Sequence, residues 1–308
     1  MKYISETTDF QLKNSVVTIG KFDGLHIGHQ MLIDHVLELK KQGYQSVMFT
    51  FSLHPNNLFN EQETRLIYTN DEKFQKLKEE GLDVLIAYPF TKTTAALEPE
   101  EFIKRVLVEQ CDVKKIIVGN DFKFGKNGRG NVDMLIQYSK QYDYDVYAYE
   151  KVEYEDEIVS ATRVREAIRE GRMEEVTKML GRPYSVIGEV VHGQKLGRTI
   201  GIPTINIHPE EGKLLPPNGV YSATVEIDGI EYPGVTNIGY KPTVGDKNKL
   251  GVETYIIDYQ GDLYGKILEV KLYHFLRPEQ KFNSLEELKN QLHADVDHSL
   301  EKYNTVKG

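Results

Sequence analysis

Four short apolar runs constrain the fold of this 308-residue chain more than any other feature of its sequence. Each run is apolar on consecutive positions, so both faces of each strand should be buried, as in a parallel sheet that helices cover on both sides. The runs lie at residues 16–19, 46–51, 84–87 and 115–118. Helical stretches separate them, at residues 29–41, 70–80 and 98–108. This alternation predicts an α/β domain with a doubly wound parallel sheet.

The second half of the chain has a different pattern, which begins near Gly181-Arg182-Pro183. Before this point, residues 162–180 are charged and amphipathic and predict a helix that Gly171 weakens in the middle. After it, Gly and Pro become frequent and short strands are expected. We therefore predict two domains, at residues 1–182 and 183–308.

The expected strands of the second domain alternate between apolar and polar residues. In residues 266–276, Leu268, Val270 and Leu272 share one face, as in a half-solvated antiparallel strand. Residues 221–228 alternate similarly, and the Asp228-Gly229 dipeptide that follows indicates a hairpin turn. Several short strands with such turns predict a small antiparallel β-barrel.

A helix is expected to close the second domain. It should cover residues 284–300, with Ser284 as its N-cap and Glu287 placed to complete a capping box. The predicted architecture is therefore a doubly wound α/β domain, followed by a small barrel and a C-terminal helix.

Charge and composition exclude several kinds of protein. The chain carries 38 basic and 47 acidic residues, a net charge of −9, which disfavours broad nucleic-acid binding because such binding neutralises many phosphates. No apolar run approaches the ~20 residues of a membrane helix, and no export signal begins the sequence. The single cysteine, Cys111, can form no internal disulfide and cannot by itself ligate a structural zinc. We expect a cytoplasmic protein that binds neither nucleic acid nor membranes.

A glycine-rich segment with two histidines, residues 20–29, follows the first predicted strand and opens the first helix. The carboxyl end of a parallel strand beside a helix N-terminus is a ready anion site. His26 and His29 lie three residues apart, so one helical turn presents both on one face. Two imidazole donors at this point suit a triphosphate that is attacked at its α-phosphorus. One alternative is that the two histidines are metal ligands, although no third His or Cys lies nearby. The other is that they are structural surface residues.

His26-Ile27-Gly28-His29 resembles the signature of the nucleotidyltransferase superfamily, which class I aminoacyl-tRNA synthetases share. With Phe22-Asp23-Gly24 in front, the string resembles the adenylyltransferase half of bacterial bifunctional riboflavin kinase/FAD synthetases. The resemblance implies a Rossmann-like fold and an ATP site. Its ATP-binding residues would be Gly20, Phe22, Asp23, Gly24, His26 and His29, the two histidines being catalytic.

Two further segments match this family in order. Residues 118–125 resemble its second nucleotide–flavin loop, which implies roles for Asn120, Asp121, Phe122 and Phe124. Residues 160–165 resemble its third motif, which contacts ATP phosphates. Thr162 can cap the following helix, and Arg165 can direct a fork of donors toward phosphate, where the resemblance makes it catalytic. Without the other motifs, these segments would indicate a strand-end turn and an ordinary N-cap.

A second glycine-rich and basic segment, residues 193–206, can wrap a nucleotide. The Thr204 hydroxyl and the Asn206 amide oxygen can coordinate Mg²⁺, which prefers oxygen ligands. The segment resembles the riboflavin-kinase domain of the same family, whose hallmark is Pro-Thr-Ala-Asn. The resemblance implies that ATP and Mg²⁺ are bound by Gly193, Gly197, Arg198, Thr204 and Asn206.

The remaining candidates are expected to border the flavin of the kinase. Glu253 is a lone carboxylate in an otherwise apolar or β-branched strand, and it is a candidate general base for a primary alcohol. Its alternative is an ordinary outward-facing strand residue. The resemblance also places Tyr221 and Arg277 at the flavin site.

These matches imply a bifunctional enzyme of flavin cofactor synthesis. Its substrates would be riboflavin, FMN and ATP with Mg²⁺, and its products FMN and then FAD with release of pyrophosphate. Ala161 replaces a serine of the family and Ile205 replaces the alanine of its hallmark, so a homologue with one active half is an alternative. A second alternative is a tRNA-charging enzyme, which the acidic charge balance and the missing Lys-Met-Ser-Lys-Ser string oppose. A third alternative is a non-catalytic flavin-binding regulatory protein.

Overall fold

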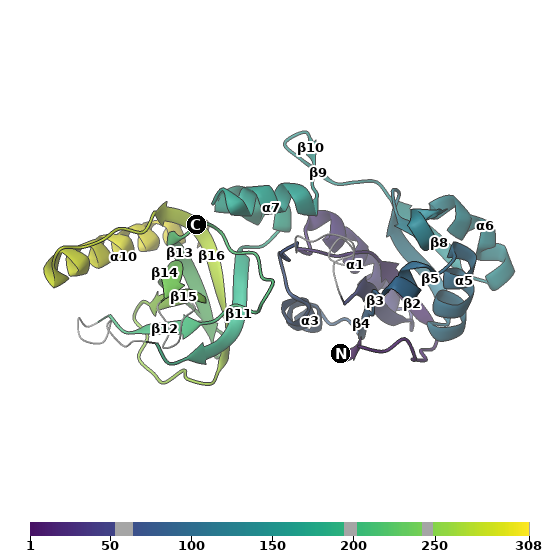
Figure 1. The fold of residues 1–308 in the computed structure, drawn as a ribbon, viewed down its shortest axis with the longest axis horizontal. Helices are drawn as coiled ribbons and strands as arrows, with labels where there is room; N and C mark the ends of the chain where they lie inside the picture. The colour runs from purple at the N-terminus through teal and green to yellow at the C-terminus, as the bar shows by residue number, and fades with distance from the viewer. Residues whose placement is uncertain (53–63, 194–201, 242–248, 308) are drawn as a thin grey trace. The chain divides into compact units, whose positions relative to one another are not determined.

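The computed structural model of the protein describes residues 1–52, 64–193, 202–241 and 249–307 (Figure 1). The chain divides into two compact units, Met1–Ala161 and Thr162–Gly308. This division places the segment 162–180 in the second unit, whereas the sequence pattern assigns it to the first domain. Within the described residues, none of the helices combines the length and the apolarity that a membrane crossing requires.

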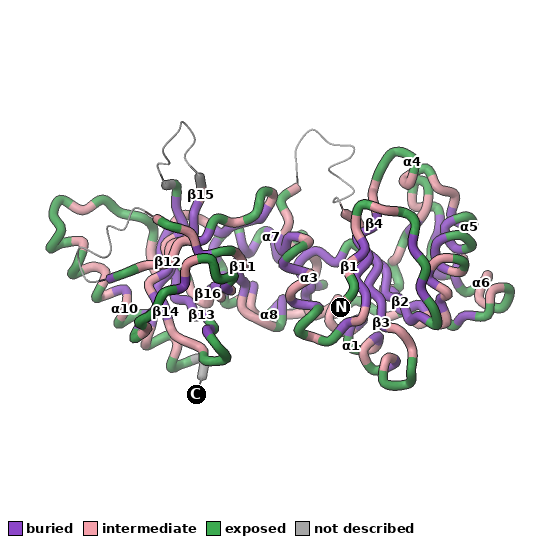
Figure 2. Tube along the Cα trace, turned by 90° about the horizontal axis from the view of Figure 1, so that it is seen from below, coloured by how far each residue is buried: buried purple, intermediate pink, exposed green. Residues whose placement is uncertain are grey.

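Six parallel strands form the centre of the first unit. Their order is β1-β4-β3-β2-β5-β8, and every neighbouring pair runs parallel. The four predicted apolar runs are confirmed as the central strands, and β2 and β4 are buried at every position (Figure 2). The strands are β1 (Lys2–Ser5), β2 (Ser15–Ile19), β3 (Gln45–Phe51), β4 (Val84–Tyr88), β5 (Val113–Gly119) and β8 (Asp145–Tyr149).

Helices cover both faces of this sheet, as predicted for a doubly wound fold. On one face, Leu32 of α1, Leu77 of α3 and Met48 of β3 belong to one buried cluster. On the other face, Leu107 of η1 and Leu135 of α6 belong to a second buried cluster. The helices are α1 (Ile27–Lys40), α3 (Asn70–Glu79), α4 (Lys92–Ala95), α5 (Pro99–Glu101), η1 (Phe102–Gln110) and α6 (Val132–Tyr142). Short elements complete the unit: β6 (Lys123–Phe124), η2 (Lys126–Gly128), β7 (Gly130–Asn131), β9 (Glu153–Tyr154) and β10 (Glu157–Ile158).

Two predicted helices are interrupted. Residues 98–108 form the short α5 and then a π-helix, η1, whose wider turns still bury Phe102 and Leu107. Within residues 162–180, Gly171 takes a φ of 72° and separates α7 from α8. This left-handed conformation favours glycine, so the residue that weakens the predicted helix is the one that breaks it.

The predicted small antiparallel barrel is confirmed in the second unit. It is closed and has six strands in the order β11-β12-β15-β14-β13-β16. Asp228 and Gly229 form the predicted hairpin turn between β13 and β14, with φ values of 52° and 80°. The elements are α7 (Ala161–Arg169), α8 (Met173–Leu180), β11 (Tyr184–Val191), β12 (Thr204–Ile207), β13 (Gly219–Ile227), β14 (Ile230–Lys241), β15 (Lys249–Ile256), β16 (Ile267–Arg277) and α10 (Leu285–Lys307).

One expectation about the barrel is wrong. Residues 221–228 are expected to form a half-solvated strand, but β13 is buried at nearly every position. The reason is that α10 packs on β13, so that one face of the strand lines the barrel interior and the other lies under the helix. The strand at residues 266–276 is confirmed, with Leu268, Val270 and Leu272 buried.

The C-terminal helix starts as predicted. The Ser284 hydroxyl accepts a hydrogen bond from the Glu287 N–H at 3.1 Å, as an N-cap does. Only this half of the capping box forms, because the Glu287 carboxylate accepts the N–H of Asn283 at 2.9 Å rather than that of Ser284.

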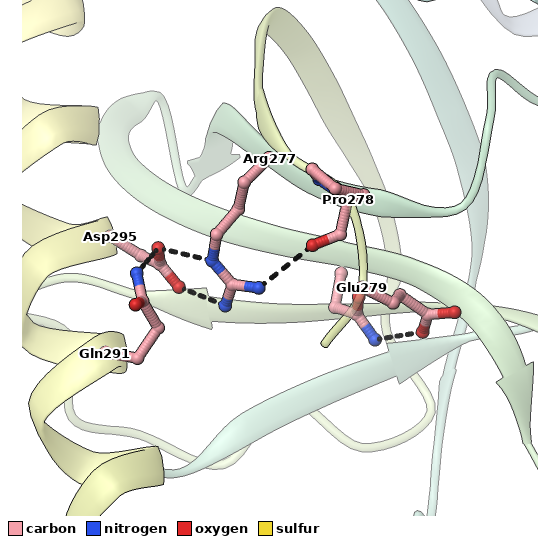
Figure 3. Close-up of polar contacts among 6 residues, drawn as sticks. Arg277, Pro278, Glu279, Gln291 and Asp295 are labelled. Atoms are coloured by element: carbon pink, nitrogen blue, oxygen red, sulfur yellow. Dashed lines mark hydrogen bonds and ion pairs between the residues drawn. The ribbon is translucent and has the colours of Figure 1, made fainter. Parts of the chain in front are cut away.

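An ion pair fastens α10 to the barrel (Figure 3). The Arg277 guanidinium on β16 donates from Nε and Nη2 to the two carboxylate oxygens of Asp295, at 2.8 and 2.7 Å. Gln291 donates to the same carboxylate at 2.9 Å. Asp295 is only 1% exposed. With two parallel hydrogen bonds, the arginine can compensate the free-energy cost of burying the Asp295 carboxylate.

We expect Arg277→Ala to lower the free energy of unfolding by about 3–5 kcal/mol, because it leaves the Asp295 carboxylate buried without its cation. Denaturant-induced unfolding followed by circular dichroism measures this change. The matched control is Lys266→Ala, which removes a cation whose partner Asp228 is 83% exposed. That control should change stability by less than about 1 kcal/mol. Equal effects of the two substitutions would contradict the role of the buried pair.

Candidate active sites

Two loops leave the sheet where its strand order reverses. β2 has β3 on one side and β5 on the other. In open parallel sheets, ligands bind at the carboxyl ends of the strands beside such a reversal. The loop after β2 carries residues 20–26. The segment after β5, here called the loop after β5, carries residues 120–124 and includes the two-residue strand β6. The fold therefore brings two of the predicted motifs to the same edge of the sheet.

The loop after β2 has a constrained backbone. Phe22, Gly24 and Leu25 have φ values of 47°, 86° and 45°, in the left-handed region. Phe22 and Leu25 are 1% and 0% exposed, so their packing holds two non-glycine residues in this conformation. At Gly24 a side chain would also collide, since a Cβ would lie 2.9 Å from Ile67 Cδ1.

Gly20 and Asp23 hold this loop in place. The Gly20 N–H donates to the Phe49 carbonyl at 3.1 Å, and Asp23 Oδ1 accepts the Ile67 N–H at 2.9 Å. Asp23 is 2% exposed. Both residues thus have structural partners, and their contact with ATP stays a prediction.

His26 and His29, here called the histidine pair, stack on each other where α1 begins. Their ring centroids lie 3.7 Å apart with an angle of 18° between the planes. The Phe22 ring packs against the His29 ring at 5.0 Å. Both Nδ1 atoms are buried and have no hydrogen-bond partner among the described residues. Unpaired ring nitrogens at a helix N-terminus are suited to hydrogen bonding with phosphate oxygens.

Burial keeps the histidine pair neutral. Removal from water lowers the pKa of His26 from 6.5 to about 4. The pKa of His29 is lowered well below its ordinary value, first by burial and then by the nearby charges of His26 and Lys73. At neutral pH the two rings therefore act as neutral hydrogen-bonding groups rather than as cations.

The loop after β5 is fixed by residues that follow β8. The Asn120 amide donates to the Glu150 carboxylate at 2.5 Å. Asp121 pairs with the Lys151 ammonium at 2.8 Å. Both partners are surface side chains, so these contacts orient the loop more than they stabilise the fold.

The same loop carries an aromatic face. The rings of Phe122 and Phe124 lie parallel, with centroids 5.5 Å apart and an interplanar angle of 18°. Phe124 is buried, whereas Phe122 is only partly buried. Gly125 follows with a φ of 69° and packs against Pro99, where a Cβ would lie 2.8 Å from Cγ. A planar ligand can stack on such a face.

The third nucleotide motif lies on α7. This helix begins at Ala161, so Thr162 lies inside its first turn and is exposed, instead of capping the helix as expected. Arg165 is 8% exposed. The second compact unit begins at Thr162. A contact of Thr162 and Arg165 with ATP therefore remains a prediction.

In the barrel, three predicted residues come together on two neighbouring strands. Thr204 and Asn206 lie on β12, and the cross-strand partner of Asn206 is Glu253 of β15. The Thr204 hydroxyl donates to Glu253 Oε1 at 2.6 Å. Directly paired residues share one face of a sheet, so a hydroxyl, an amide and a carboxylate face the same side. This oxygen-rich set is of the kind that Mg²⁺ prefers.

Gly193 supports this cluster, because a methyl group at that position would collide with the Asn206 amide. Gly197 and Arg198 lie outside the described residues. The sequence reasoning missed Asn237 of β14, which is the cross-strand partner of Glu253 on its other side. The sequence signal that could have identified Asn237 is its amide side chain in an otherwise apolar or β-branched stretch.

Tyr221 and Arg277 have protein partners in the barrel. The Tyr221 hydroxyl donates to the Pro217 carbonyl at 2.5 Å, and burial raises the pKa of this fully buried side chain. The Arg277 guanidinium is engaged by Asp295. The structure thus gives both residues structural roles, and their contact with flavin stays a prediction.

Comparison with known proteins matches both halves of the chain. A family model described as FAD synthetase matches residues 9–163, and one described as riboflavin kinase matches residues 180–303. A bifunctional riboflavin kinase/FMN adenylyltransferase of Listeria monocytogenes is 36% identical over 285 residues, covering 92% of this chain and 90% of that protein. The chain belongs to the bifunctional riboflavin kinase/FMN adenylyltransferase family.

Other members of the family match over a similar length. The protein of the same name from Escherichia coli K12 is 36% identical, over 91% of this chain and 90% of its own length. A crystal structure from Streptococcus pneumoniae, described as a macrolide-efflux protein, is 32% identical with a TM-score of 0.83. It covers 96% of this chain and 97% of its own. The fold of that protein is therefore similar to the fold of this chain.

We expect the free energy of unfolding to fall as the pH decreases from about 6.5 to about 4. Over this interval the unfolded chain protonates position 26 and the folded chain does not, so acid favours unfolding. Between about pH 7 and about pH 5, the wild type should lose about 2 kcal/mol more than His26→Asn.

Urea unfolding of the two proteins at both pH values measures this difference. The control is His293→Asn, which replaces an exposed histidine of α10 and should retain the wild-type pH dependence. If His26→Asn shows the same pH dependence as the wild type, His26 is not held neutral by the fold.

Proposed function

We propose that the chain transfers phosphate from ATP to riboflavin to form FMN, and then joins AMP from a second ATP to FMN to form FAD and pyrophosphate. The observation that carries this proposal is the 2.6 Å hydrogen bond between Thr204 and Glu253. This contact between Thr204 and Glu253 supports a role for Glu253 as the base and for Thr204 as a ligand of Mg·ATP. The stacked histidine pair, whose two Nδ1 atoms have no hydrogen-bond partner in the part of the chain that the structure describes, supports the second activity.

In the kinase reaction, Glu253 would accept the proton of the riboflavin 5′-hydroxyl. The Thr204 hydroxyl holds one carboxylate oxygen, which fixes the direction of the other. The alcohol oxygen then attacks the γ-phosphorus and ADP leaves. A positioned base contributes roughly 10²–10⁴-fold in rate, and phosphoryl transfer otherwise depends on positioning and charge neutralisation.

Thr204 and Asn206 would hold the magnesium ion through their side-chain oxygens. When bound, Mg²⁺ neutralises charge on the phosphates of ATP. The fit rests on the chemistry of the donors, since a hydroxyl and an amide oxygen beside a carboxylate suit a hard cation. Glu253 would remain outside this ligand set, as the proton acceptor.

In the adenylyltransferase reaction, the attacking group is the FMN phosphate, which is already an anion and needs no base. The histidine pair would donate hydrogen bonds to the phosphates of ATP as charge develops on them. Thr162 and Arg165 would add donors, and Phe122 would offer the flavin an aromatic face. The domains of the two activities would be residues 1–182 and 183–308, and the use of ATP fits a cytoplasmic enzyme.

A time course with riboflavin, ATP and Mg²⁺, resolved by chromatography, tests both activities. The expected order is FMN first and FAD later. His29→Asn should lower FAD formation by about 10²–10³-fold and leave FMN formation unchanged. Glu253→Gln should lower FMN formation by about 10²–10⁴-fold, while supplied FMN is still converted to FAD.

Two substitutions serve as matched controls for this experiment. His35→Asn changes a histidine of α1 that bonds to Tyr149, and Glu226→Gln changes an exposed carboxylate of β13. Neither should affect either rate by more than about twofold. Formation of FMN without FAD would indicate that the first half is inactive. The first substitution to test would then be Ala161→Ser, which restores the serine of the family. Tight FMN binding without any product would favour a flavin-binding regulatory protein.

Gly193→Ala should selectively impair the kinase. The added methyl group would displace the Asn206 amide from its place beside Glu253. We expect kcat/KM for riboflavin phosphorylation to fall by about 10–100-fold, because small displacements in a site are costly. FAD formation from supplied FMN, measured in the same preparation, is the internal control. Unchanged phosphorylation would show that Asn206 is not needed at its observed position.

A further inference from the structure

The proposed base Glu253 lies in the middle of a row of side chains that crosses four neighbouring strands of the barrel. Its partner on β12 is Asn206, and its partner on β14 is Asn237. Beyond Asn237 the row continues with Val220 of β13, whose side chain cannot form hydrogen bonds. Directly paired residues face the same side of a sheet. Asn237 is therefore the polar neighbour of Glu253 on the side away from Asn206.

The row faces a side of these strands that a ligand can reach. Asn206, Asn237 and Glu253 are all half-buried. Thr236 and Thr254, which are next to Asn237 and Glu253 in the sequence, lie on the opposite face and are both 0% exposed. Their hydroxyl groups bond to each other at 2.9 Å. The polar side chains of the row therefore belong to the accessible face of the strands and not to the core.

The segment after β16 brings a carboxylate to Asn237. The Asn237 amide donates to Glu279 Oε1 at 3.4 Å, and the Asn218 amide donates to Glu279 Oε2, also at 3.4 Å. Gly239 leaves room for this carboxylate, because a Cβ at that position would collide with Glu279 Oε1. Figure 3 shows Glu279 directly after Pro278 at the end of this strand. Residues from three separate segments thus meet beside the row.

The contacts of Glu279 are suited to a ligand that carries hydroxyl groups. Both are longer than a typical N–H···O hydrogen bond, which measures roughly 2.7–3.2 Å. A hydroxyl group both donates and accepts, so it can accept a hydrogen bond from the Asn237 amide and donate one to the Glu279 carboxylate. A bound hydroxyl can therefore bridge the two side chains with better geometry than they have with each other.

The geometry of phosphoryl transfer gives the direction in which such a ligand lies. The attacking and leaving oxygens are roughly in line with the transferred phosphorus. Thr204 and Asn206, the proposed ligands of Mg·ATP, are on β12, on one side of Glu253. The rest of the alcohol therefore extends toward the other side, where β14 carries Asn237. Neighbouring strands are only about 4.8 Å apart, so a five-carbon chain can reach from one to the next.

We propose that Asn237 is a specificity-determining residue of the kinase site, which together with Glu279 binds hydroxyl groups of the ribityl chain of riboflavin. This inference rests on the proposed function of the barrel. Asn237 contacts the substrate next to the hydroxyl that reacts, and Glu279 holds the amide and accepts from the chain. A site that hydrogen-bonds the hydroxyl groups of its substrate rejects an analogue without them, because the polar groups that the analogue covers are left without partners.

Two substrates and four full-length proteins test this role. The substrates are riboflavin and a flavin with the same ring whose five-carbon chain carries only the terminal hydroxyl. The proteins are the wild type, Asn237→Ala, Asn237→Thr and the control Asn290→Ala, which removes an exposed amide of α10. For each combination, kcat/KM for phosphorylation of the flavin is measured. FAD formation from supplied FMN in the same preparation reports on the other activity.

We expect the wild type to prefer riboflavin to the analogue by about 100-fold or more. Asn237→Ala should lower kcat/KM for riboflavin by about 10–100-fold, as loss of a hydrogen-bonding partner does, and change that for the analogue by no more than about twofold. Asn237→Thr keeps a hydroxyl in a residue that strands favour, so it should retain more of the preference. Asn290→Ala should behave as the wild type, and FAD formation should be unchanged in all variants.

Two results would overturn the role of Asn237 alone. One is a wild type that phosphorylates both flavins equally well. The other is an equal loss with both flavins in Asn237→Ala and Asn237→Thr, which would indicate that Asn237 only supports the strand. If Asn237→Ala is unstable, the threonine variant makes the same comparison. A wild-type chain that phosphorylates neither flavin would overturn the proposed kinase function together with this inference.

Discussion

The proposed adenylyltransferase site depends on the sharp loop between β2 and α1. Three of its residues adopt left-handed backbone angles, and two of them, Phe22 and Leu25, are not glycine. Each such residue costs roughly 1–3 kcal/mol, which burial of the two side chains offsets. The hydrogen bond from Ile67 to Asp23 joins this loop to the segment before α3. One loop therefore determines the positions of the histidine pair and of the start of α1, and it is joined to the segment before α3.

The proposed kinase site depends on strand register instead. Its residues come from neighbouring strands, and the register of β12, β15 and β14 aligns Asn206, Glu253 and Asn237 in one row. A slip of one residue in β12 would turn Thr204 and Asn206 to the opposite face. Closure of the barrel fixes this register, because each strand is paired on both sides. The same hydrogen bonds between strands therefore stabilise the barrel and fix the geometry of the proposed site.

The sequence predicts what depends on local pattern and misses what depends on distant packing. The four central strands follow from burial on both faces, which a single run of residues reveals. Edge strands β1 and β8 lack such runs, and β13 is mistaken for a half-solvated strand because the covering helix α10 comes more than fifty residues later. For the sites, family resemblance proposes Thr204 and Glu253, and the structure brings these two side chains into contact. The Arg277–Asp295 pair, in contrast, requires knowledge of the fold.

The stacked histidines also have a consequence for how protons accompany nucleotide binding. With ring centroids 3.7 Å apart, a charge on one imidazole strongly opposes a charge on the other. The two rings therefore titrate as one coupled unit, not as two independent bases. An arriving triphosphate can draw one proton onto the pair far more readily than two. The pair thereby limits how steeply the affinity for ATP can vary with acidity.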